Sequence, residues 1–373
     1  MIKLQGKYNN AIIFTDFVEE LAQFQIIKLL NQEAFKNCNI KIMPDVHAGA
    51  GCVIGFTSTI NNKVIPNLVG VDIGCGVDAI NIGKIKNINF QELDNFIYEN
   101  IPSGFNKRNE IYPLLKLNKN VYINDLNYIE EITELDVNTI LKSLGTLGGG
   151  NHFIELNKDS YDNIWICVHS GSRNPGLKVA NYFQNIAKEY CKNNDIKIES
   201  SLEYLEGYYL EKYLYCVKFI QYYAQVNRQI IIDILKKYFK IKKSIDYISS
   251  IHNYIGDDNI IRKGAISSYK NEKLIIPINM KDGSIIGYGE SNKDWNYSAP
   301  HGAGRLMSRG DAKRNILLED FSKSMKGIWS SCIDEERLDE SPFVYKNINT
   351  IINTITESVN IIDIIKPLYN FKG

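Results

Sequence analysis

The chain has 373 residues, 44% of them hydrophobic and 23% charged, and its 43 lysine and arginine residues balance 43 aspartate and glutamate residues. This composition is typical of soluble globular proteins and excludes a bulk electrostatic attraction to nucleic acid or membranes, so binding to RNA would need a local patch. There is no signal-peptide pattern and no run of about 18 uncharged apolar residues, and the seven scattered cysteines form no CxxC pair. We therefore expect a cytoplasmic protein without a membrane span or a disulfide framework.

Short strands and tight turns are expected through most of the first third of the chain, with one amphipathic helix at about 17–31. The strands predicted in the first half lie near 40–46, 52–60, 75–83, 151–157 and 164–169. Two helices are predicted at about 176–192 and 201–239, where apolar residues recur at helical spacing. Strands return at 259–265, 273–279 and 284–289, and the last two predicted helices lie near 309–325 and 346–357.

The order of these elements predicts the fold class. Strands surround a helical insertion at about 176–250 without regular alternation of strand and helix, and this pattern favours an α+β fold. No linker rich in proline, glycine or serine divides the chain. We therefore expect a single domain over residues 1–373.

Glycine and histidine gather in five windows of the sequence. The windows, 44–57, 66–78, 144–156, 168–176 and 300–310, hold more than half of the 26 glycines and all but one of the five histidines. Glycine lets a backbone approach a ligand closely, and histidine can bind a metal ion or exchange protons. The windows therefore predict where a ligand site lies.

One hard oxygen, one soft sulfur and three imidazoles are candidates for a metal site: Asp72, Cys75, His152, His169 and His252. Such a set can hold one or two divalent transition ions, with the thiolate able to bridge them. Each residue alone has a structural alternative, since a lone cysteine is most often a small buried apolar residue and a lone aspartate can cap a turn. The spacing differs from that of closed structural zinc sites.

His301 has a different setting, between a proline and two glycines. Arg305 and Arg309 follow it and would share one helix face if a helix begins near Gly304. A basic helix start suits a phosphate group. An imidazole facing phosphate beside metal ions can be a ligand, a general base or a covalent nucleophile, and spacing alone does not choose among these roles.

The same windows resemble the motif series of the RNA-splicing ligase RtcB family. The motifs run in the family's order from about residue 40 to the last residue: "MPDVHAGAGCVIG", "VGVDIGCGV", "LGTLGGGNHFIEL", "VHSGSR", "RKGA", "APHGAGRLMSR" and "IIKPLYNFKG". The resemblance, to the shorter members, implies the family's single-domain α+β fold, with β-sheets around a central metal cleft. It also implies an enzyme that uses GTP and Mn²⁺ to join RNA 3′-phosphate or 2′,3′-cyclic phosphate ends to 5′-hydroxyl ends, with archease as an example of an activating partner.

The resemblance also implies residue roles. Asp72, Cys75, His152, His169 and His252 would hold two Mn²⁺ ions with Cys75 bridging, and His301 would attack the α-phosphate of GTP to form a histidine–GMP intermediate. The residues expected to bind the nucleotide are Asn151, Glu155, Asn279, Ser284, Gly302, Gly304, Tyr345 and Lys372. Arg173, Arg305 and Arg309 would receive RNA phosphates.

The chain departs from the family pattern at Ala50, where a lysine is usual, and at "NMKDG", where many members have Ser-Met-Gly-Thr. These changes leave the choice of RNA and nucleotide open, and His47 is either a phosphate contact or part of a structural turn. Two alternatives to the ligase are a metal-dependent RNA-end phosphoesterase and a catalytically silent RNA-end binder.

Overall fold

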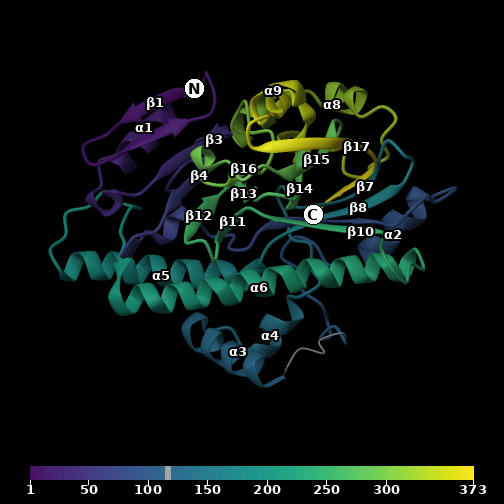
Figure 1. Ribbon diagram of the computed structural model, residues 1–373. Coiled ribbons are helices and arrows are strands. Elements are labelled where there is room, and N and C mark those ends of the chain that lie inside the picture. The colour runs from purple at the N-terminus through teal and green to yellow at the C-terminus, as the bar shows by residue number, and fades with distance from the viewer. Residues whose placement is uncertain (114–118) are drawn as a thin grey trace.

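A computed structural model describes residues 1–113 and 119–373 (Figure 1). Within these ranges a six-stranded sheet has the order β1 (Ile2–Gln5), β2 (Asn10–Ile13), β3 (Ile40–His47), β4 (Ile54–Thr59), β12 (Ile260–Lys263) and β11 (Asn253–Ile255). A seven-stranded sheet has the order β10 (Asp246–Ile251), β6 (Gly76–Asn81), β8 (Ile164–Ser170), β7 (Phe153–Lys158), β17 (Val359–Lys372), β15 (Gly283–Gly289) and β14 (Lys273–Asn279). Two short pairs join β13 (Ala265–Ser267) to β16 (Ser298–Pro300) and β5 (Lys63–Val64) to β9 (Leu205–Glu206).

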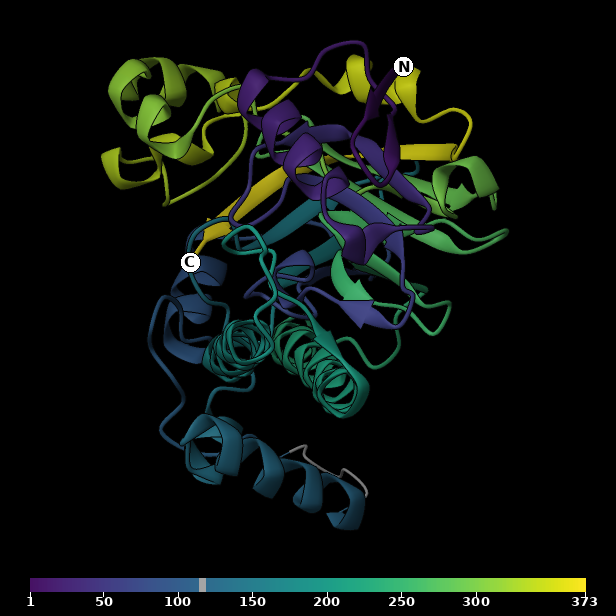
Figure 2. The same ribbon diagram turned by 90° about the vertical axis from the view of Figure 1, so that its left-hand side faces the viewer.

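Helices cover these sheets on different sides. They are α1 (Glu20–Leu30), α2 (Phe90–Asn100), α3 (Lys119–Thr133), α4 (Val137–Lys142), α5 (Arg173–Asn193), α6 (Gly207–Tyr238), α7 (Arg309–Asn315), α8 (Leu318–Ser324) and α9 (Ile348–Thr354). In Figures 1 and 2 the long helices α5 and α6 lie side by side beneath the sheets, with α3 below them and with α8 and α9 on the opposite side of the molecule.

The face that α6 buries follows from its sequence. Leu214, Val217, Ile220 and Ala224 recur at helical spacing, and all of them except the half-buried Leu214 are fully or almost fully buried. Ile220 belongs to the same apolar core as Val168 of β8, and α6 packs beneath β8 and β6 of the seven-stranded sheet. Burial of each large aliphatic side chain there stabilises the fold by about 1.5–3 kcal/mol. Two polar residues, Asn227 and Arg228, interrupt this apolar face and are completely buried.

The mixture of helices and sheets confirms the predicted α+β class. The region expected to be a helical insertion at about 176–250 does contain α6 and nearly all of α5, but it also supplies β9 and most of β10 to the sheets. Among the described residues no helix is both long and apolar enough to cross a bilayer. The single domain over residues 1–373 stays a prediction.

Several predicted elements were wrong in the first third and near the end. The first third was expected to hold one helix, but α2 also lies there, and α3 and α4 follow it before residue 143. The helix expected at 309–325 is two helices, because Leu317 adopts an extended conformation between α7 and α8. Strand β17 was not predicted, since its Pro367 indicates a strand break, whereas here the proline lies at a bulge where β17 pairs with β7.

Candidate functional site

The sheet topology explains how distant residues meet. Strands β10, β6, β8 and β7 are adjacent and antiparallel, so the start of β6, the end of β8 and the start of β7 lie at one edge of the sheet. Cys75 directly precedes β6, His152 directly precedes β7, and His169 lies near the end of β8. His252 follows β10, whose last residue pairs with Gly76. Four neighbouring strands therefore deliver four candidate ligands to the same edge.

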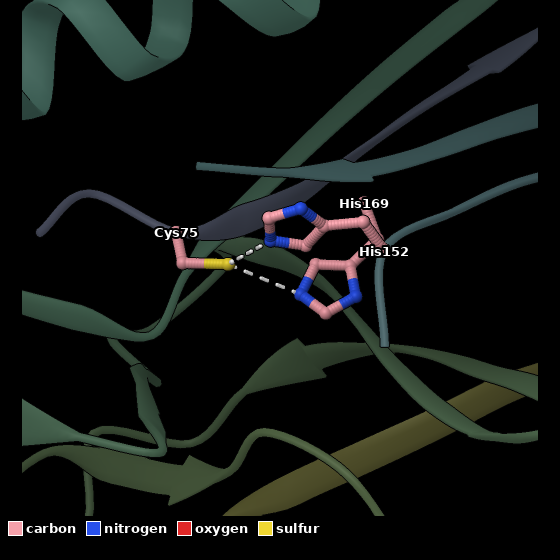
Figure 3. Close-up of side chains that lie close together, drawn as sticks. All are labelled: Cys75, His152 and His169. Carbon is pink, nitrogen blue, oxygen red and sulfur yellow. Dashed lines mark hydrogen bonds between the residues drawn. The ribbon is translucent and has the colours of Figure 1, made fainter. Parts of the chain in front are cut away.

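The distances within this group are short. The Sγ atom of Cys75 lies 3.2 Å from Nε2 of His169 and 3.5 Å from Nε2 of His152 (Figure 3). The Nε2 atom of His152 lies 3.2 Å from Oδ2 of Asp72, and the Nε2 atoms of His169 and His252 are 3.3 Å apart. All five predicted metal ligands therefore lie together, and we call Asp72, Cys75, His152, His169 and His252 the ligand cluster.

The protonation of the ligand cluster suits a cation. Burial lowers the pKa of His169 and of His252 well below the ordinary value, so both imidazoles are neutral near pH 7. The Nδ1 atom of His169 lies 3.0 Å from the carbonyl oxygen of Asn151. Since a carbonyl only accepts, Nδ1 carries the hydrogen and the lone pair on Nε2 faces Cys75, which is the usual arrangement of a metal-binding histidine.

The acidic members of the cluster complete the donor set. Burial opposes ionisation of Asp72, but the hydrogen bond and charge of His152 lower the pKa of Asp72 to about 2. Burial and the Asp72 carboxylate raise the pKa of the Cys75 thiol well above its usual range. A bound cation reverses this balance because it deprotonates a coordinating thiol. Crowded nitrogen lone pairs, a thiol and a carboxylate thus fit a divalent transition ion.

His301 lies beside the ligand cluster. Its ring centroid is 4.8 Å from that of His252, and its Nδ1 atom is 2.7 Å from Oδ2 of Asp45. Asp45 is completely buried and also accepts a hydrogen bond from the backbone N–H of His301. The carboxylate therefore binds the hydrogen on Nδ1 and leaves the lone pair on Nε2. Asp45 was not predicted, although it lies in the first glycine-rich window.

A cavity of about 580 Å³ joins these groups, and we call it the cleft. Four of the five residues of the ligand cluster line it, and so do ten of the other predicted site residues. The lining residues that were predicted are Asp72, Cys75, Asn151, Glu155, His169, His252, Asn279, His301, Gly302, Gly304, Arg305, Arg309, Tyr345 and Lys372. The lining also includes His47, whose Nδ1 donates to the carbonyl of Asp45.

Three predicted residues lie outside the lining of the cleft. His152 is buried beside Cys75. Ser284 is fully buried in β15, and its hydroxyl has no hydrogen-bond partner. Arg173, the first residue of α5, donates to the hydroxyl of Thr146 and to the carbonyl of Gly104, so its guanidinium is held by protein groups.

Another buried carboxylate, that of Glu340, fixes two residues of the cleft lining. Glu340 accepts hydrogen bonds from Nζ of Lys372 and from the hydroxyl of Tyr345, each at 2.9 Å. Burial opposes ionisation of Glu340, but the Lys372 charge lowers the pKa of Glu340 below its ordinary value. Burial raises the pKa of Glu155 to about 7, against the opposing effect of Lys372. Glu340 was not predicted, because the adjacent acidic residues Asp339 and Glu340 in "RLDESPF" form no recognisable motif.

The arginines near His301 are arranged differently from the prediction. Residues 304–308 form no helix, and Arg309 is the first residue of α7. The expectation that Arg305 and Arg309 share one helix face was therefore wrong. The two guanidiniums instead converge on one acidic segment. Arg305 donates to the carbonyl of Asp339, and Arg309 forms a 2.9 Å ion pair with the carboxylate of the same residue.

Two glycines of the windows bring protein segments together rather than facing the cleft. Gly74 has φ +76°, and a Cβ atom there would lie 2.9 Å from Cβ of Ala224 in α6. A Cβ atom on Gly171 would lie 2.0 Å from Oδ1 of Asp72. These glycines therefore let the Asp72–Cys75 loop pack against α6 and the end of β8.

The chain is similar in sequence to the members of one known protein family. The family model described as "tRNA-splicing ligase RtcB" matches residues 27–373. The chain is 32% identical to RNA-splicing ligase RtcB1 of Escherichia coli (strain ATCC 25922), with 90% of each chain covered. It is 27% identical to tRNA-splicing ligase RtcB of Aeropyrum pernix, over 83% of this chain and 82% of that one, and 25% identical to RNA-splicing ligase RtcB homolog 1 of Entamoeba histolytica, over 99% and 90%. The chain therefore belongs to the RtcB family of RNA-splicing ligases.

Proposed function

We propose that this protein is a cytoplasmic RNA ligase that uses GTP and Mn²⁺ to join RNA 3′-phosphate or 2′,3′-cyclic phosphate ends to 5′-hydroxyl ends. The observation that carries the proposal is the position of His301, whose imidazole is held by Asp45 and lies beside the ligand cluster in one cleft. Membership of the RtcB family supports the RNA substrate. An archease-type activator is a further expected partner.

The ligand cluster would hold the metal. The donors of this cluster are oxygen, sulfur and nitrogen atoms within a few ångströms of one another. We propose that these donors would hold two Mn²⁺ ions, and the residues that supply them are Asp72, Cys75, His152, His169 and His252. Bound Mn²⁺ would neutralise the charge on the phosphates and hold them in line for displacement. Burial keeps His169 and His252 neutral and so available as ligands.

His301 is the proposed nucleophile. The lone pair on Nε2 attacks the α-phosphorus of GTP, a P–N bond forms, and the bond to pyrophosphate breaks, leaving GMP on the ring. The ring becomes positively charged as it attacks, and the Asp45 carboxylate 2.7 Å from Nδ1 stabilises that charge and fixes the tautomer. The resulting phosphoramidate is labile, as an activated intermediate requires.

The RNA then receives the GMP. An oxygen of the RNA 3′-phosphate attacks the GMP phosphorus, which forms a P–O bond and releases His301. The 5′-hydroxyl of the other RNA end next attacks the 3′-phosphorus, and GMP leaves with the electron pair of the broken bond. A 2′,3′-cyclic end must first be opened by water to give the 3′-phosphate.

The remaining residues would bind the two substrates. We propose that the nucleotide is held by Asn151, Glu155, Asn279, Ser284, Gly302, Gly304, Tyr345 and Lys372, and that Arg173, Arg305 and Arg309 receive RNA phosphates. All of these residues except Ser284 and Arg173 line the cleft, which supports the assignment. Lys372 and Tyr345 reach the cleft already fixed by Glu340, so little side-chain freedom is lost when a nucleotide binds.

Incubation with α-labelled GTP and Mn²⁺ tests the proposal. We expect a protein-bound label that is labile in acid and stable in base, and that is absent from His301→Ala. His47→Ala is the comparison, because His47 also lines the cleft and donates its Nδ1 hydrogen to a backbone carbonyl, so its loss can weaken GTP binding but leaves the nucleophile in place. A label that survives in His301→Ala contradicts the proposal. Opened cyclic ends without joined RNA, with or without GTP, would favour a phosphoesterase instead.

A further inference from the structure

Two adjacent polar residues of α6 are completely buried beneath the ligand cluster. Asn227 and Arg228 have no exposed surface, although they lie on the apolar face of the helix between Ala224 and Ile231. Burial of an amide and a guanidinium is costly unless their donors and acceptors are paired. The partners of these two side chains are therefore informative.

Asn227 joins two of the segments that carry the ligand cluster. Its side-chain oxygen accepts from the backbone N–H groups of Gly145 and Thr146, at 2.8 and 3.0 Å. Its amide nitrogen donates to the hydroxyl of Ser170 at 3.0 Å and to the carbonyl of Gly171 at 3.1 Å. Asn227 thus connects the turn that leads to His152 with the residues that directly follow His169.

Arg228 joins the segment that carries Cys75 to the segment that carries His169. Its Nη1 donates to the carbonyl of Gly74 at 2.8 Å and to the carbonyl of Ser170 at 3.1 Å. These carbonyls belong to the residue before Cys75 and the residue after His169. Its Nε forms a 2.8 Å ion pair with Asp78, which is also completely buried, so the guanidinium is held firmly from the other side.

We propose that Asn227 and Arg228 are positioning residues that set the spacing of Cys75, His152 and His169. One rigid helix holds all three ligand segments at backbone groups, so the donor atoms keep a metal-binding geometry before a metal arrives. Neither residue lines the cleft, so their effect passes through the ligand cluster. This inference rests on the proposed function in one respect, since it requires that the ligand cluster binds metal.

The test compares two matched pairs of variants of the full chain. Arg228→Lys keeps a positive charge opposite Asp78 but cannot donate to both carbonyls. Its control is Arg262→Lys. Arg262 is also buried and forms a 2.7 Å ion pair with Asp258, but it bonds to no segment that carries a metal ligand. Asn227→Leu removes the amide at constant size. Its control is Asn296→Leu, since Asn296 is equally buried but bonds to Asn39 and Thr57.

The readouts are metal binding and its spectrum, with folding checked by circular dichroism. We expect the Kd for Mn²⁺, measured by electron paramagnetic resonance, to rise about 10–100-fold in Arg228→Lys and Asn227→Leu. With Co²⁺ as a probe, we expect the sulfur-to-cobalt charge-transfer band to shift or weaken in both. The controls should keep the wild-type Kd and spectrum even where their unfolding temperature falls.

Three outcomes would overturn the inference. Folded Arg228→Lys and Asn227→Leu proteins with wild-type Kd and spectrum show that the pair does not position the cluster. If the controls lose as much affinity for metal as Arg228→Lys and Asn227→Leu do, then Asn227 and Arg228 contribute only to the stability of the protein. A wild-type protein that binds neither Mn²⁺ nor Co²⁺ removes the proposed function as well, which separates that failure from the first two.

Discussion

The carboxylate of Asp45 lies 2.7 Å from Nδ1 of His301, and it reaches that position from β3, more than 250 residues earlier in the chain. The same carboxylate oxygen accepts from the backbone N–H of His301. Asp45 therefore fixes both the main chain and the imidazole of the proposed nucleophile.

Replacement of Asp45 should slow nucleotide transfer to His301. Asp45→Asn keeps the size but permits the wrong tautomer of the imidazole, and we expect the rate of label transfer from GTP to fall about 10²–10⁴-fold. Single-turnover labelling measures this rate. Asp258→Asn is the control, because Asp258 is an equally paired carboxylate that contacts Arg262 and Tyr269 instead of His301. Similar rates in Asp45→Asn and wild type would exclude the orienting role.

Replacement of Cys75 should remove sulfur from the metal site. We expect Cys75→Ser to lose the sulfur-to-cobalt charge-transfer band, because the hydroxyl is a poorer ligand than a thiolate for transition ions. Cys216→Ser is the control, since Cys216 is a buried cysteine on α6 outside the ligand cluster. Absorption titration with Co²⁺ measures both. A charge-transfer band that persists in Cys75→Ser would show that the thiolate comes from elsewhere.

The sequence predicts the members of the site better than their arrangement. Asp72, Cys75, His152 and His169 lie in windows whose glycines indicate tight loops, whereas His252 lies outside these windows and was predicted from its residue type and the family resemblance. Their meeting at one edge depends on the strand order β10-β6-β8-β7, which pairs segments far apart in the chain. No local pattern carries that order. Asp45 acts by holding His301, and Glu340 acts by holding Lys372 and Tyr345. An isolated acidic residue in the sequence has no periodicity that would reveal such a role.

Of the elements that were not predicted, some had a recognisable signal in the sequence and others had none. Helix α2 places Phe90, Leu93 and Ile97 at helical spacing, and Asn89 caps it by accepting from the N–H of Glu92, so both signals were present in the sequence. Strand β17 is different, because its proline contradicts the strand pattern and is tolerated only through the bulge beside β7.

Glu155 should make the stability of the protein depend on pH. Its pKa is raised to about 7 by burial, so the folded state keeps its proton between about pH 4.5 and 7 while the unfolded state loses it. The contribution is complete below about pH 4.5 and is lost as the pH rises to about 7. We expect the wild-type free energy of unfolding to fall by on the order of 3 kcal/mol relative to Glu155→Gln over this range.

Urea unfolding at several pH values measures this difference, and Glu340→Gln gives a control of opposite sign. The pKa of Glu340 is lowered, so its contribution is present above the ordinary pKa of glutamate and is lost as the pH falls. Parallel pH profiles of wild type and Glu155→Gln would contradict the raised pKa.

Gly74 should be required for both stability and metal binding. Gly74 has φ +76°, and an added Cβ would lie 2.9 Å from Ala224 of α6, so Gly74→Ala combines backbone strain with overpacking and should cost about 2–4 kcal/mol. Gly207 has φ +55° with no atom within 4 Å of an added Cβ, so Gly207→Ala isolates the backbone strain and should cost about 1–2 kcal/mol. Only Gly74→Ala should also raise the Kd for Mn²⁺, because only Gly74 lies directly before Cys75. Equal unfolding free energies and equal Kd values in the two variants would show that the contact with α6 does not hold the ligand loop.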